Sequence, residues 1–513
     1  MNIINNKSVF LISIVLLLLT MASISAQDND TALNSAAEID SSNNVHNDVR
    51  LSITENSDVV SVSSNGGYVD YKLLENASES ESSDADSSSS KIHNFSDLKE
   101  TLDNAASGST VLLSGTYKYN NDTDSALKKG VKIPKSLKLI GVGSCIIDGA
   151  GAARCFKTEK SCTITLQNLI IQNAYSYQSS GGALLVGEKT KLTIKNCTFK
   201  NNKAVNNKNK YYANGGALSI RPNAKVFIYD SKFLNNYVKN GNGGAIYLRE
   251  NSYVEVHNSV FNKNTAKRVS SLPLKKYKSG MGAAIKTSIG CTVKLYGSSF
   301  KSNKAYDTVI LVVTESTNGK KLSNLYVKNC YFKSNNVLKD GVIYLDEFGK
   351  ATILNSRFIK NKSPYGSGTV IFDVAKKGSS IKNCLFKGNT GAFGGGLCIR
   401  IVEGNNKLRS HVNIVKCNFT KNTAKLFGGA IFAQYGVIKI KNCKFTGNVA
   451  KKSYGGALYF RFGKLIVTKS KFIKNKASKG GAIAYSSKKA KFSKNKFSKN
   501  KSRKKKNSKI YKF

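Results

Sequence analysis

The chain has 513 residues and carries 80 lysines and arginines against 31 aspartates and glutamates, so its formal net charge is +49 at pH 7. Carboxylates are scarce, which disfavours both a glycoside hydrolase, with its two positioned carboxylates, and a lyase that holds Ca²⁺ through several acidic groups. The four histidines, His46, His93, His257 and His411, show no nucleophile or metal-ligand spacing around them. The sequence therefore predicts no catalytic residue, no metal site and no cofactor.

Residues 1–26 have the pattern of a secretory signal peptide. Lys7 precedes an apolar run from Val9 to Leu19, and small residues follow up to Ala26. The alternative is an uncleaved anchor, but the run is shorter than the roughly 20 residues that a spanning helix needs. We expect a secreted or cell-surface protein with no transmembrane anchor in the mature chain.

Residues 27–92 are rich in Ser, Asn and acidic residues and show little apolar periodicity. Such a composition buries too little apolar surface to offset the entropy of ordering, so we expect a disordered acidic linker. From Asn94 to Ala106 the period becomes helical, with Phe95, Leu98 and Leu102 on one face and Asn94 or Ser96 as N-cap. This predicts a short helix that caps the domain behind it.

Two signals then repeat along the chain, mostly at steps of 25 to 34 residues. The first is Gly-Gly-Ala followed by Leu or Ile, which begins at Gly181, Gly215, Gly243, Gly428, Gly455 and Gly480. The second is Phe-x-x-Asn, which begins at Phe199, Phe233, Phe261, Phe300, Phe332, Phe358, Phe386, Phe419, Phe445 and Phe472. Within each unit the apolar period is two, which indicates strands. Units that repeat in one order must stack as coils, about 4.8 Å apart.

Stacking aligns like residues in columns. Residues that tolerate a left-handed backbone form the first column, which predicts a corner at Asn196, Asp230, Asn258, Gly297, Asn329, Asn355, Asn383 and Asn442, interrupted by Lys416 and Lys469. The next column holds Cys or Ser and should point inward. The Phe-x-x-Asn motif then predicts an inward stack of phenylalanines and a ladder of asparagines whose amides bond from coil to coil.

These paired motifs resemble the repeats of chlamydial polymorphic outer-membrane proteins and, more closely, those of adhesin-like proteins of methanogenic archaea. The first coil is similar to the latter too, in Phe95-Ser-Asp-Leu98 and in the stretch from Gly108 to Tyr117. The resemblance covers roughly residues 93 to 500. It implies an all-β chain, a right-handed parallel β-helix (solenoid) of the pectin lyase-like kind with a short N-terminal capping helix, and a role in adhesion or surface display.

The cysteines are even in number, ten in all, which in a secreted chain suggests disulfides. Five of them, however, share a column with serine: Cys197, Cys330, Cys384, Cys417 and Cys443. This indicates a requirement for small size, so we favour packing over one or two disulfides and over a metal site.

One column after the Gly-Gly-Ala strand contains a candidate ligand-binding site. Its outward members are Arg221, Arg249, Asp346, Asp373, Arg400 and Arg461. Two carboxylates and an arginine follow one another in Asp346, Asp373 and Arg400, and we select these three as the site. The alternative for them is a solvated ladder of ion pairs.

We place the β-helix at residues 93–490 and a basic, Lys-rich tail at residues 491–513, which either blunts the end of the solenoid or binds an anion. The function we expect is non-enzymatic: a secreted or cell-surface adhesin-like protein whose basic β-helix binds an anionic polysaccharide of a cell wall or a host-surface glycan. The alternatives are a polysaccharide lyase or related carbohydrate-active enzyme, and a structural envelope component. Nucleic acid is not an expected partner.

Overall fold

The computed structural model describes residues 60–64, 67–71, 91–207, 213–268, 279–313, 323–346, 348–366, 368–400, 410–503 and 508–513. The chain divides into two units, Met1–Ser87 and Ser88–Phe513. The predicted signal peptide at residues 1–26 lies outside the described residues.

In the first unit, β1 (Val60–Ser64) and β2 (Gly67–Tyr71) pair as an antiparallel hairpin. They lie inside the segment 27–92 that the composition predicts to be disordered, so that prediction is wrong for these two strands. The physical reason is local: the sequence between them is Asn65-Gly66, a dipeptide typical of two-residue hairpin turns. The rest of the predicted linker, up to residue 90, lies outside the described residues.

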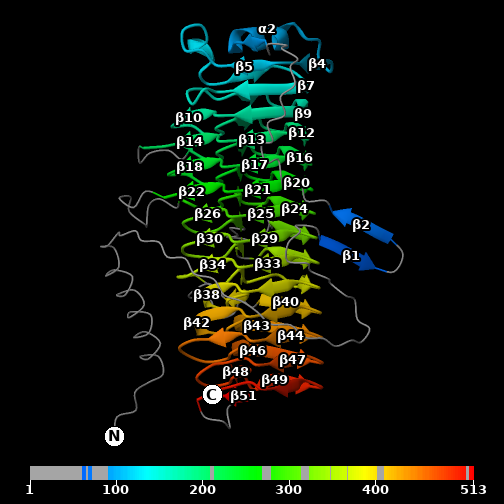
Figure 1. Cartoon of the computed structure of the whole chain (residues 1–513), viewed down its shortest axis with the longest axis vertical. Coiled ribbons are helices and arrows are strands. Elements are labelled where there is room, and N and C mark those ends of the chain that lie inside the picture. Colours follow the sequence, from blue (N-terminus) through cyan, green and yellow to red (C-terminus); the bar gives the residue numbers. More distant parts are fainter. Residues whose placement is uncertain are drawn as a thin grey trace, which may run out of the picture. The chain divides into compact units, whose positions relative to one another are not determined.

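The second unit is the predicted right-handed parallel β-helix, with a helix at its N-terminal end (Figure 1). Most coils contain four short strands joined by tight corners. In one coil, β15 (Leu218–Ile220) follows Gly-Gly-Ala, β16 (Lys225–Tyr229) carries alternating buried residues, β17 (Lys232–Leu234) holds the phenylalanine, and β18 (Tyr237–Lys239) closes the coil. Each strand pairs in parallel with its counterpart in the next coil.

The strands therefore form four stacks along the β-helix. The first stack follows the Gly-Gly-Ala signal. It consists of β6 (Val131–Ile133), β8 (Phe156–Thr158), β11 (Leu184–Val186), β15, β19 (Ile246–Leu248), β23 (Ile285–Thr287), β27 (Ile310–Val312), β31 (Ile343–Leu345), β35 (Val370–Asp373), β39 (Leu397–Arg400), the first halves of β43 (Ile431–Lys441) and β46 (Leu458–Thr468), β48 (Ile483–Ser486) and β51 (Ile510–Lys512).

The second stack is built from the longer strands. It consists of β4 (Thr110–Leu113), the first halves of β7 (Leu137–Asp148) and β9 (Thr163–Gln172), β12 (Lys191–Lys195), β16, β20 (Tyr253–His257), β24 (Thr292–Tyr296), β28 (Asn324–Lys328), β32 (Lys350–Leu354), β36 (Ser379–Lys382), β40 (Ser410–Val415), the second halves of β43 and β46, and β49 (Lys489–Ser493).

The third stack carries the phenylalanine ladder. It consists of β3 (Ile92–His93), β5 (Thr116–Lys118), the second halves of β7 and β9, β13 (Thr198–Lys200), β17, β21 (Val260–Asn262), β25 (Ser299–Lys301), β29 (Tyr331–Lys333), β33 (Arg357–Ile359), β37 (Leu385–Lys387), β41 (Asn418–Thr420), β44 (Lys444–Thr446), β47 (Lys471–Ile473) and β50 (Lys496–Ser498).

The fourth stack is a separate ten-stranded sheet that closes the coils. It consists of β10 (Tyr175–Tyr177), β14 (Lys203–Val205), β18, β22 (Thr265–Lys267), β26 (Lys304–Ala305), β30 (Asn336–Val337), β34 (Lys362–Ser363), β38 (Thr390–Phe393), β42 (Thr423–Phe427) and β45 (Val449–Ala450).

The predicted columns are confirmed inside the coils. The phenylalanines stack face to face from Phe199 to Phe497 with ring centroids 4.7 to 5.1 Å apart. The asparagine ladder runs from Asn202 to Asn500, each Nδ2 donating to Oδ1 of the next member at 2.9 to 3.0 Å. These two ladders hold the coils in a single register.

The corners and the small column also follow the prediction. The corner residues have positive φ, and so do Lys416 and Lys469, with φ of 52° and 49°, although lysine is unusual there. In the Cys/Ser column, the Sγ of Cys197 and the Oγ of Ser231 donate alike to a carbonyl oxygen two residues earlier, at 3.3 and 2.6 Å. All ten cysteines are buried free thiols.

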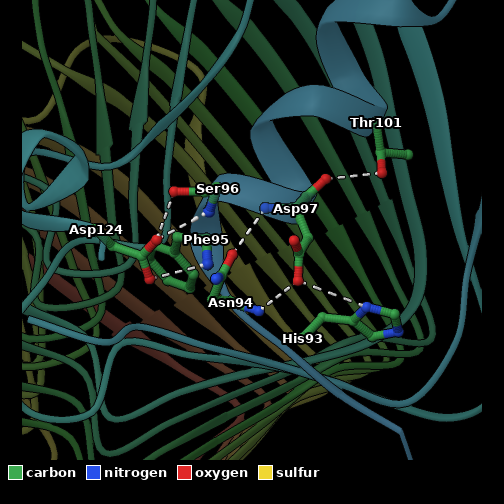
Figure 2. Close-up of polar contacts among 7 residues, drawn as sticks. All are labelled: His93, Asn94, Phe95, Ser96, Asp97, Thr101 and Asp124. Atoms are coloured by element: carbon green, nitrogen blue, oxygen red, sulfur yellow. Dashed lines mark hydrogen bonds and ion pairs between the residues drawn. The ribbon is translucent and has the colours of Figure 1, made fainter. Parts of the chain in front are cut away.

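The N-terminal cap is the helix α2 (Phe95–Asn104), which buries Phe95, Leu98 and Leu102 against the first coils. Asn94 is its N-cap: Oδ1 accepts from the Asp97 nitrogen at 2.8 Å, while Oδ2 of Asp97 accepts from the Asn94 nitrogen at 2.9 Å (Figure 2). This confirms the predicted helix and settles its cap on Asn94.

Asp124 anchors the start of the same helix from a distant loop, just before the short 3₁₀ turn η1 (Ser125–Leu127). Its buried carboxylate accepts from the backbone nitrogens of Phe95 (3.0 Å) and Ser96 (2.9 Å) and from the Ser96 hydroxyl at 2.7 Å (Figure 2). It also accepts from the backbone nitrogen of Asn120 at 2.9 Å. A carboxylate at a helix N-terminus also meets the positive end of the helix dipole.

The C-terminal boundary differs from the prediction. β49, β50 and β51 pair in parallel with β46, β47 and β48. The predicted end of the β-helix at residue 490 thus lies inside β49, and residues 491–513 contribute strands and are not a tail beyond the coils. Phe497 continues the phenylalanine stack at 5.1 Å from Phe472, which explains why this lysine-rich segment folds as a coil.

Candidate functional site

The three residues predicted as a site come together on the outside of the first stack. Asp373 ends β35 and lies in register with Arg400 at the end of β39. The Arg400 Nε donates to Oδ1 of Asp373 at 2.8 Å. Asp346 directly follows β31, and its Oδ1 accepts a hydrogen bond of 3.3 Å from the Tyr344 hydroxyl. Their grouping is as predicted, while their role in binding a ligand stays a prediction.

Three further residues complete this group, which we call the acidic cluster: Asp307, Asp340, Tyr344, Asp346, Asp373 and Arg400. The Tyr344 hydroxyl donates to Oδ2 of Asp373 at 2.6 Å, and the guanidinium of Arg400 lies 5.4 Å from the Tyr344 ring centre. Arg400 Nη2 also lies 3.3 Å from Oδ1 of Asp340. One arginine thus bridges two carboxylates that stand 33 residues apart in sequence.

Most charges of the acidic cluster are removed from water, since the side chains of Asp373 and Asp340 are 6% and 10% exposed and that of Arg400 is 28% exposed. Burial alone would lower the pKa of Arg400, but Asp373 and Asp340 outweigh it and raise that pKa well above its ordinary value. Burial and the neighbouring Asp340 charge raise the pKa of Asp307. Burial also acts to raise the pKa of Asp340, but the hydrogen bond from Asp307 and the charge of Arg400 hold it below its usual value. Within this carboxyl pair, the shared environment thus favours the proton on Asp307 over Asp340.

A sequence signal for the missing carboxylates existed. Asp307 and Asp340 occupy the position where most coils have the first glycine of Gly-Gly-Ala. At Gly215, for example, φ is +73° and an added Cβ would lie 2.0 Å from the Leu218 carbonyl oxygen. Neither aspartate has a positive φ, so the backbone changes locally and gives room to a side chain. An aspartate at a column position that holds glycine in most coils is therefore the sequence signal for these two carboxylates.

A second group of polar and aromatic side chains lies on the outer face of the second stack. Tyr229, His257 and Tyr296 are in register, and their rings stack at centroid distances of 5.1 and 4.6 Å. We call these three rings the outer aromatic ladder. The sequence shows no nucleophile or metal-ligand spacing around His257, and it does not reveal this stacking, because the ring contacts are made between coils and not along the chain.

Glu255 lies beside the outer aromatic ladder and binds its neighbours. Nε2 of His257 donates to Oε1 of Glu255 at 2.9 Å, the Tyr253 hydroxyl donates to Oε2, and the Lys294 Nζ lies 3.6 Å from Oε2. Burial acts to raise the pKa of Glu255, but these hydrogen bonds and the Lys294 charge outweigh it and hold the pKa below its usual value. The carboxylate is thus satisfied from within the protein.

Lysines dominate the outward positions of the second stack. The exposed ones are Lys138, Lys191, Lys195, Lys225, Lys350, Lys382, Lys439, Lys441, Lys464, Lys489 and Lys491. From Gly404 to Phe513 the sequence contains no aspartate or glutamate. Positive charge on the coils from β40 onward therefore has no acidic side chain of the same coils beside it.

The same holds on the outer face of the third stack. Lys444, Lys471 and Lys496 are exposed and lie in direct register in three consecutive coils. We call this set the lysine row. Like charges directly opposite one another on neighbouring strands destabilise a sheet, so the row carries a repulsion that a bound polyanion would relieve.

Two further features of the described residues bear on function. No group of three or more His, Cys, Asp and Glu side chains in this part of the chain is arranged to hold a metal ion. None of the helices within the described ranges has the length and apolar character that crossing a membrane requires.

Comparisons with known proteins agree with the fold. The family model "Right handed beta helix region" matches residues 135–322, and the Chlamydia polymorphic membrane protein repeat matches residues 416–434. Over 152 residues, the chain is 30% identical to metabotropic glutamate receptor-like protein P of Dictyostelium discoideum, which is 28% of this chain and 10% of that protein. The chain thus matches about a tenth of that relative's length.

Among solved structures, the chain is similar to a mannuronic acid specific polysaccharide family 6 lyase enzyme from human gut microbiota, with 10% identity over 82% of this chain and 91% of that chain. The TM-score is 0.36, which is too low for this likeness to bear on activity. The family matches and the strand pairing lead to one conclusion: the chain contains a right-handed parallel β-helix with at least one repeat similar to those of chlamydial polymorphic membrane proteins.

Proposed function

We propose that this protein is a non-enzymatic, surface-displayed, adhesin-like β-helix that binds an acidic polysaccharide of a cell wall or a host surface. The observation that carries the proposal is the lysine row on coils that contain no acidic residue. The stacked strands hold the charges of the row about 4.8 Å apart on a rigid surface. A flexible polyanion that lies along the row neutralises several of them at once.

Surface display has separate support. The match to the polymorphic membrane protein repeat suggests a surface or outer-membrane-type protein. The pattern of residues 1–26 is that of a secretory signal peptide. Secretion would bring the basic coils into contact with anionic glycans, whereas a nucleic acid would not be an ordinary partner there.

The acidic cluster suits ligand binding less well than the lysine row does. Arg400 already donates to Asp373 and lies within ion-pair distance of Asp340, and Tyr344 donates to Asp373. A ligand carboxylate would have to displace these buried partners, which costs several kcal/mol when one charge is left unpaired. We therefore assign Asp373 and Arg400 a structural role, with Asp346 at the edge of the group.

The proposal is tested by removing charge at the lysine row. In the full chain, the double variant Lys444→Gln/Lys471→Gln should weaken binding to immobilised polygalacturonate roughly threefold to tenfold, as expected for two surface charges. The matched control, Lys99→Gln/Lys132→Gln, removes the same charge from lysines that lie beside Asp103 and Glu159. Its effect should be small. If the two double variants weaken polygalacturonate binding equally, the lysine row is not the binding element.

The lyase alternative is separated from binding by product analysis. A lyase acting on polygalacturonate releases unsaturated uronate ends that absorb in the ultraviolet. Under the proposal, incubation with the protein leaves that absorbance unchanged while the polymer stays bound. A steady rise in absorbance would replace the adhesin-like proposal with an enzymatic one.

A further inference from the structure

A shallow depression lies where the outer aromatic ladder ends. It has a volume of about 550 Å³ and is lined by Lys191, Thr193, Lys195, Phe227, Tyr229 and Asp230. This volume falls within the range of small-molecule sites, about 300–1,000 Å³. The lining combines two aromatic rings with two lysines, one aspartate and one threonine.

The depression forms because the side chains at two column positions differ between β12 and β16. Thr193 is in register with Phe227, and Lys195 with Tyr229. A short threonine and a flexible lysine thus stand where the following coils have rings or a long side chain. One face of the Tyr229 ring is covered by His257, at 5.1 Å and an interplanar angle of 18°. The opposite face is turned toward β12, where no ring covers it.

The rim of the depression is positively charged. Lys191 and Lys195 are both exposed. Among the described residues, no carboxylate lies within ion-pair distance of either one. Asp230 occupies the exposed corner after β16. Its carboxylate accepts hydrogen bonds but repels a ligand that is anionic along its whole length.

We propose that this depression binds one carboxylated pyranose unit of the polysaccharide, an inference that rests on the proposed function. The apolar C–H face of the sugar ring stacks on the free face of Tyr229, as apolar groups do on aromatic rings. The sugar carboxylate lies between Lys191 and Lys195, and sugar hydroxyls donate to Asp230 and bond Thr193. The lysine row supplies affinity for any polyanion, whereas the depression adds a preference for uronic acid units.

The same face of the β-helix offers a matched control. Lys441 lies in the second-stack column of Lys195, is also exposed, and has Thr468 and Val415 as its register neighbours. It carries the same charge beside no aromatic ring. Replacing Lys195 or Lys441 by glutamine therefore removes identical charge from equivalent backbone positions.

The test uses the full chain and three probes: hexagalacturonate, its fully methyl-esterified form, and polyphosphate of similar charge. Calorimetry measures the affinity of each. Thr193→Tyr fills the depression with a residue suited to a strand, and should weaken hexagalacturonate binding roughly fivefold while polyphosphate binding is unchanged. Lys195→Gln should weaken hexagalacturonate binding more than Lys441→Gln does. The methyl ester should bind less tightly than the acid.

Each contrary result identifies what fails. Equal effects of Lys195→Gln and Lys441→Gln, together with full binding by Thr193→Tyr, would overturn the depression as a sugar site but leave the lysine row intact. If Thr193→Tyr lowers the melting temperature, the comparison of Lys195→Gln with Lys441→Gln decides whether the depression binds the sugar. Equal affinity for the acid and its methyl ester would overturn the role of the lysines at the rim. Absence of binding to any anionic probe would overturn the proposed function itself.

Discussion

The side-chain nitrogen Nδ2 of Asn389 donates to Oδ1 of Asn422 in the following coil at 3.0 Å, and both side chains are fully buried. The same Nδ2 donates to the Phe358 carbonyl oxygen at 2.8 Å, while Oδ1 of Asn389 accepts from the backbone and side-chain nitrogens of Asn361. Every polar atom of this amide is thus used to join three coils.

Asn389→Leu should therefore destabilise the protein by about 3 kcal/mol or more, because it leaves several buried polar groups without partners at about 1–3 kcal/mol each. The control is Asn500→Leu. Asn500 is the last member of the ladder and is only partly buried, so water can replace it there. Urea unfolding of both variants checks the difference. Equal midpoints would mean that the ladder does not stabilise the interior coils.

The ion pair of Arg400 with Asp373 predicts a strong effect on stability. Arg400→Leu leaves Asp373 and Asp340 buried without their counter-charge, which should cost about 3–5 kcal/mol at pH 7. Burial acts to raise the folded pKa of Asp340, but the hydrogen bond from Asp307 and the charge of Arg400 hold it low, so the contribution of Arg400 is present at neutral pH and is lost as pH falls through that pKa. The difference in free energy of unfolding between the wild type and Arg400→Leu should therefore become smaller at acidic pH.

Thermal unfolding at neutral and acidic pH measures that difference. Arg461→Leu is the matched control, since Arg461 belongs to the same outward column but lies in coils without acidic residues. Unchanged stability of Arg400→Leu combined with lost glycan binding would restore the ligand-binding role predicted for Asp346, Asp373 and Arg400.

Asp124 predicts a pH-dependent cap. Burial acts to raise the pKa of Asp124, but its hydrogen bonds from Asn120, Phe95 and Ser96 outweigh it and lower the pKa. Its contribution is therefore present above the unfolded aspartate pKa, about 3.9, and is lost as pH falls through the lower folded value. Asp124→Asn should cost about 2 kcal/mol at pH 7 and little below that folded value. Hydrogen exchange of the α2 amides measures this loss of stability. A loss in Asp124→Asn that is the same at every pH would contradict the prediction.

The small column predicts tolerance. Cys384→Ser, Cys417→Ser and Cys443→Ser together should fold normally, because serine already makes the same bond to a carbonyl oxygen at Ser231, Ser259 and Ser356. The measurements are a thermal melt of the triple variant and non-reducing mass mapping of the wild type. A disulfide between Cys417 and Cys443 would show that sulfur itself is required.

Much of the interior could be predicted from the sequence because each column repeats one residue type. Phe199 and Asn202 have counterparts in every later coil, so the period alone aligns them. The corners at Lys416 and Lys469 were harder to predict. Their residue type argues against a left-handed backbone, yet the neighbouring coils impose the corner. Local preference yields to tertiary context where the stacked coils share one geometry.

The features that escaped prediction depend on contacts between coils. The lysines of residues 491–513 concealed another Phe-x-x-Asn motif, Phe497 to Asn500, which holds the last coil in place. His257 looks isolated along the chain, and its stacking on Tyr229 requires the register across two strands. Asp340 and Arg400 lie in coils that are separated by one further coil, so only the folded structure shows that their side chains are partners.

Binding of an anionic polysaccharide through the exposed lysines decides the proposed function of this protein. The most direct measurement is the affinity of the full chain for polygalacturonate as salt is raised from low to high concentration, because exposed charges are screened over about 10 Å at 0.1 M. The predicted result is a steep fall in affinity with salt, and a shallower fall for Lys444→Gln/Lys471→Gln. Affinity that stays constant across the salt range, with no difference between wild type and the double variant, would contradict it.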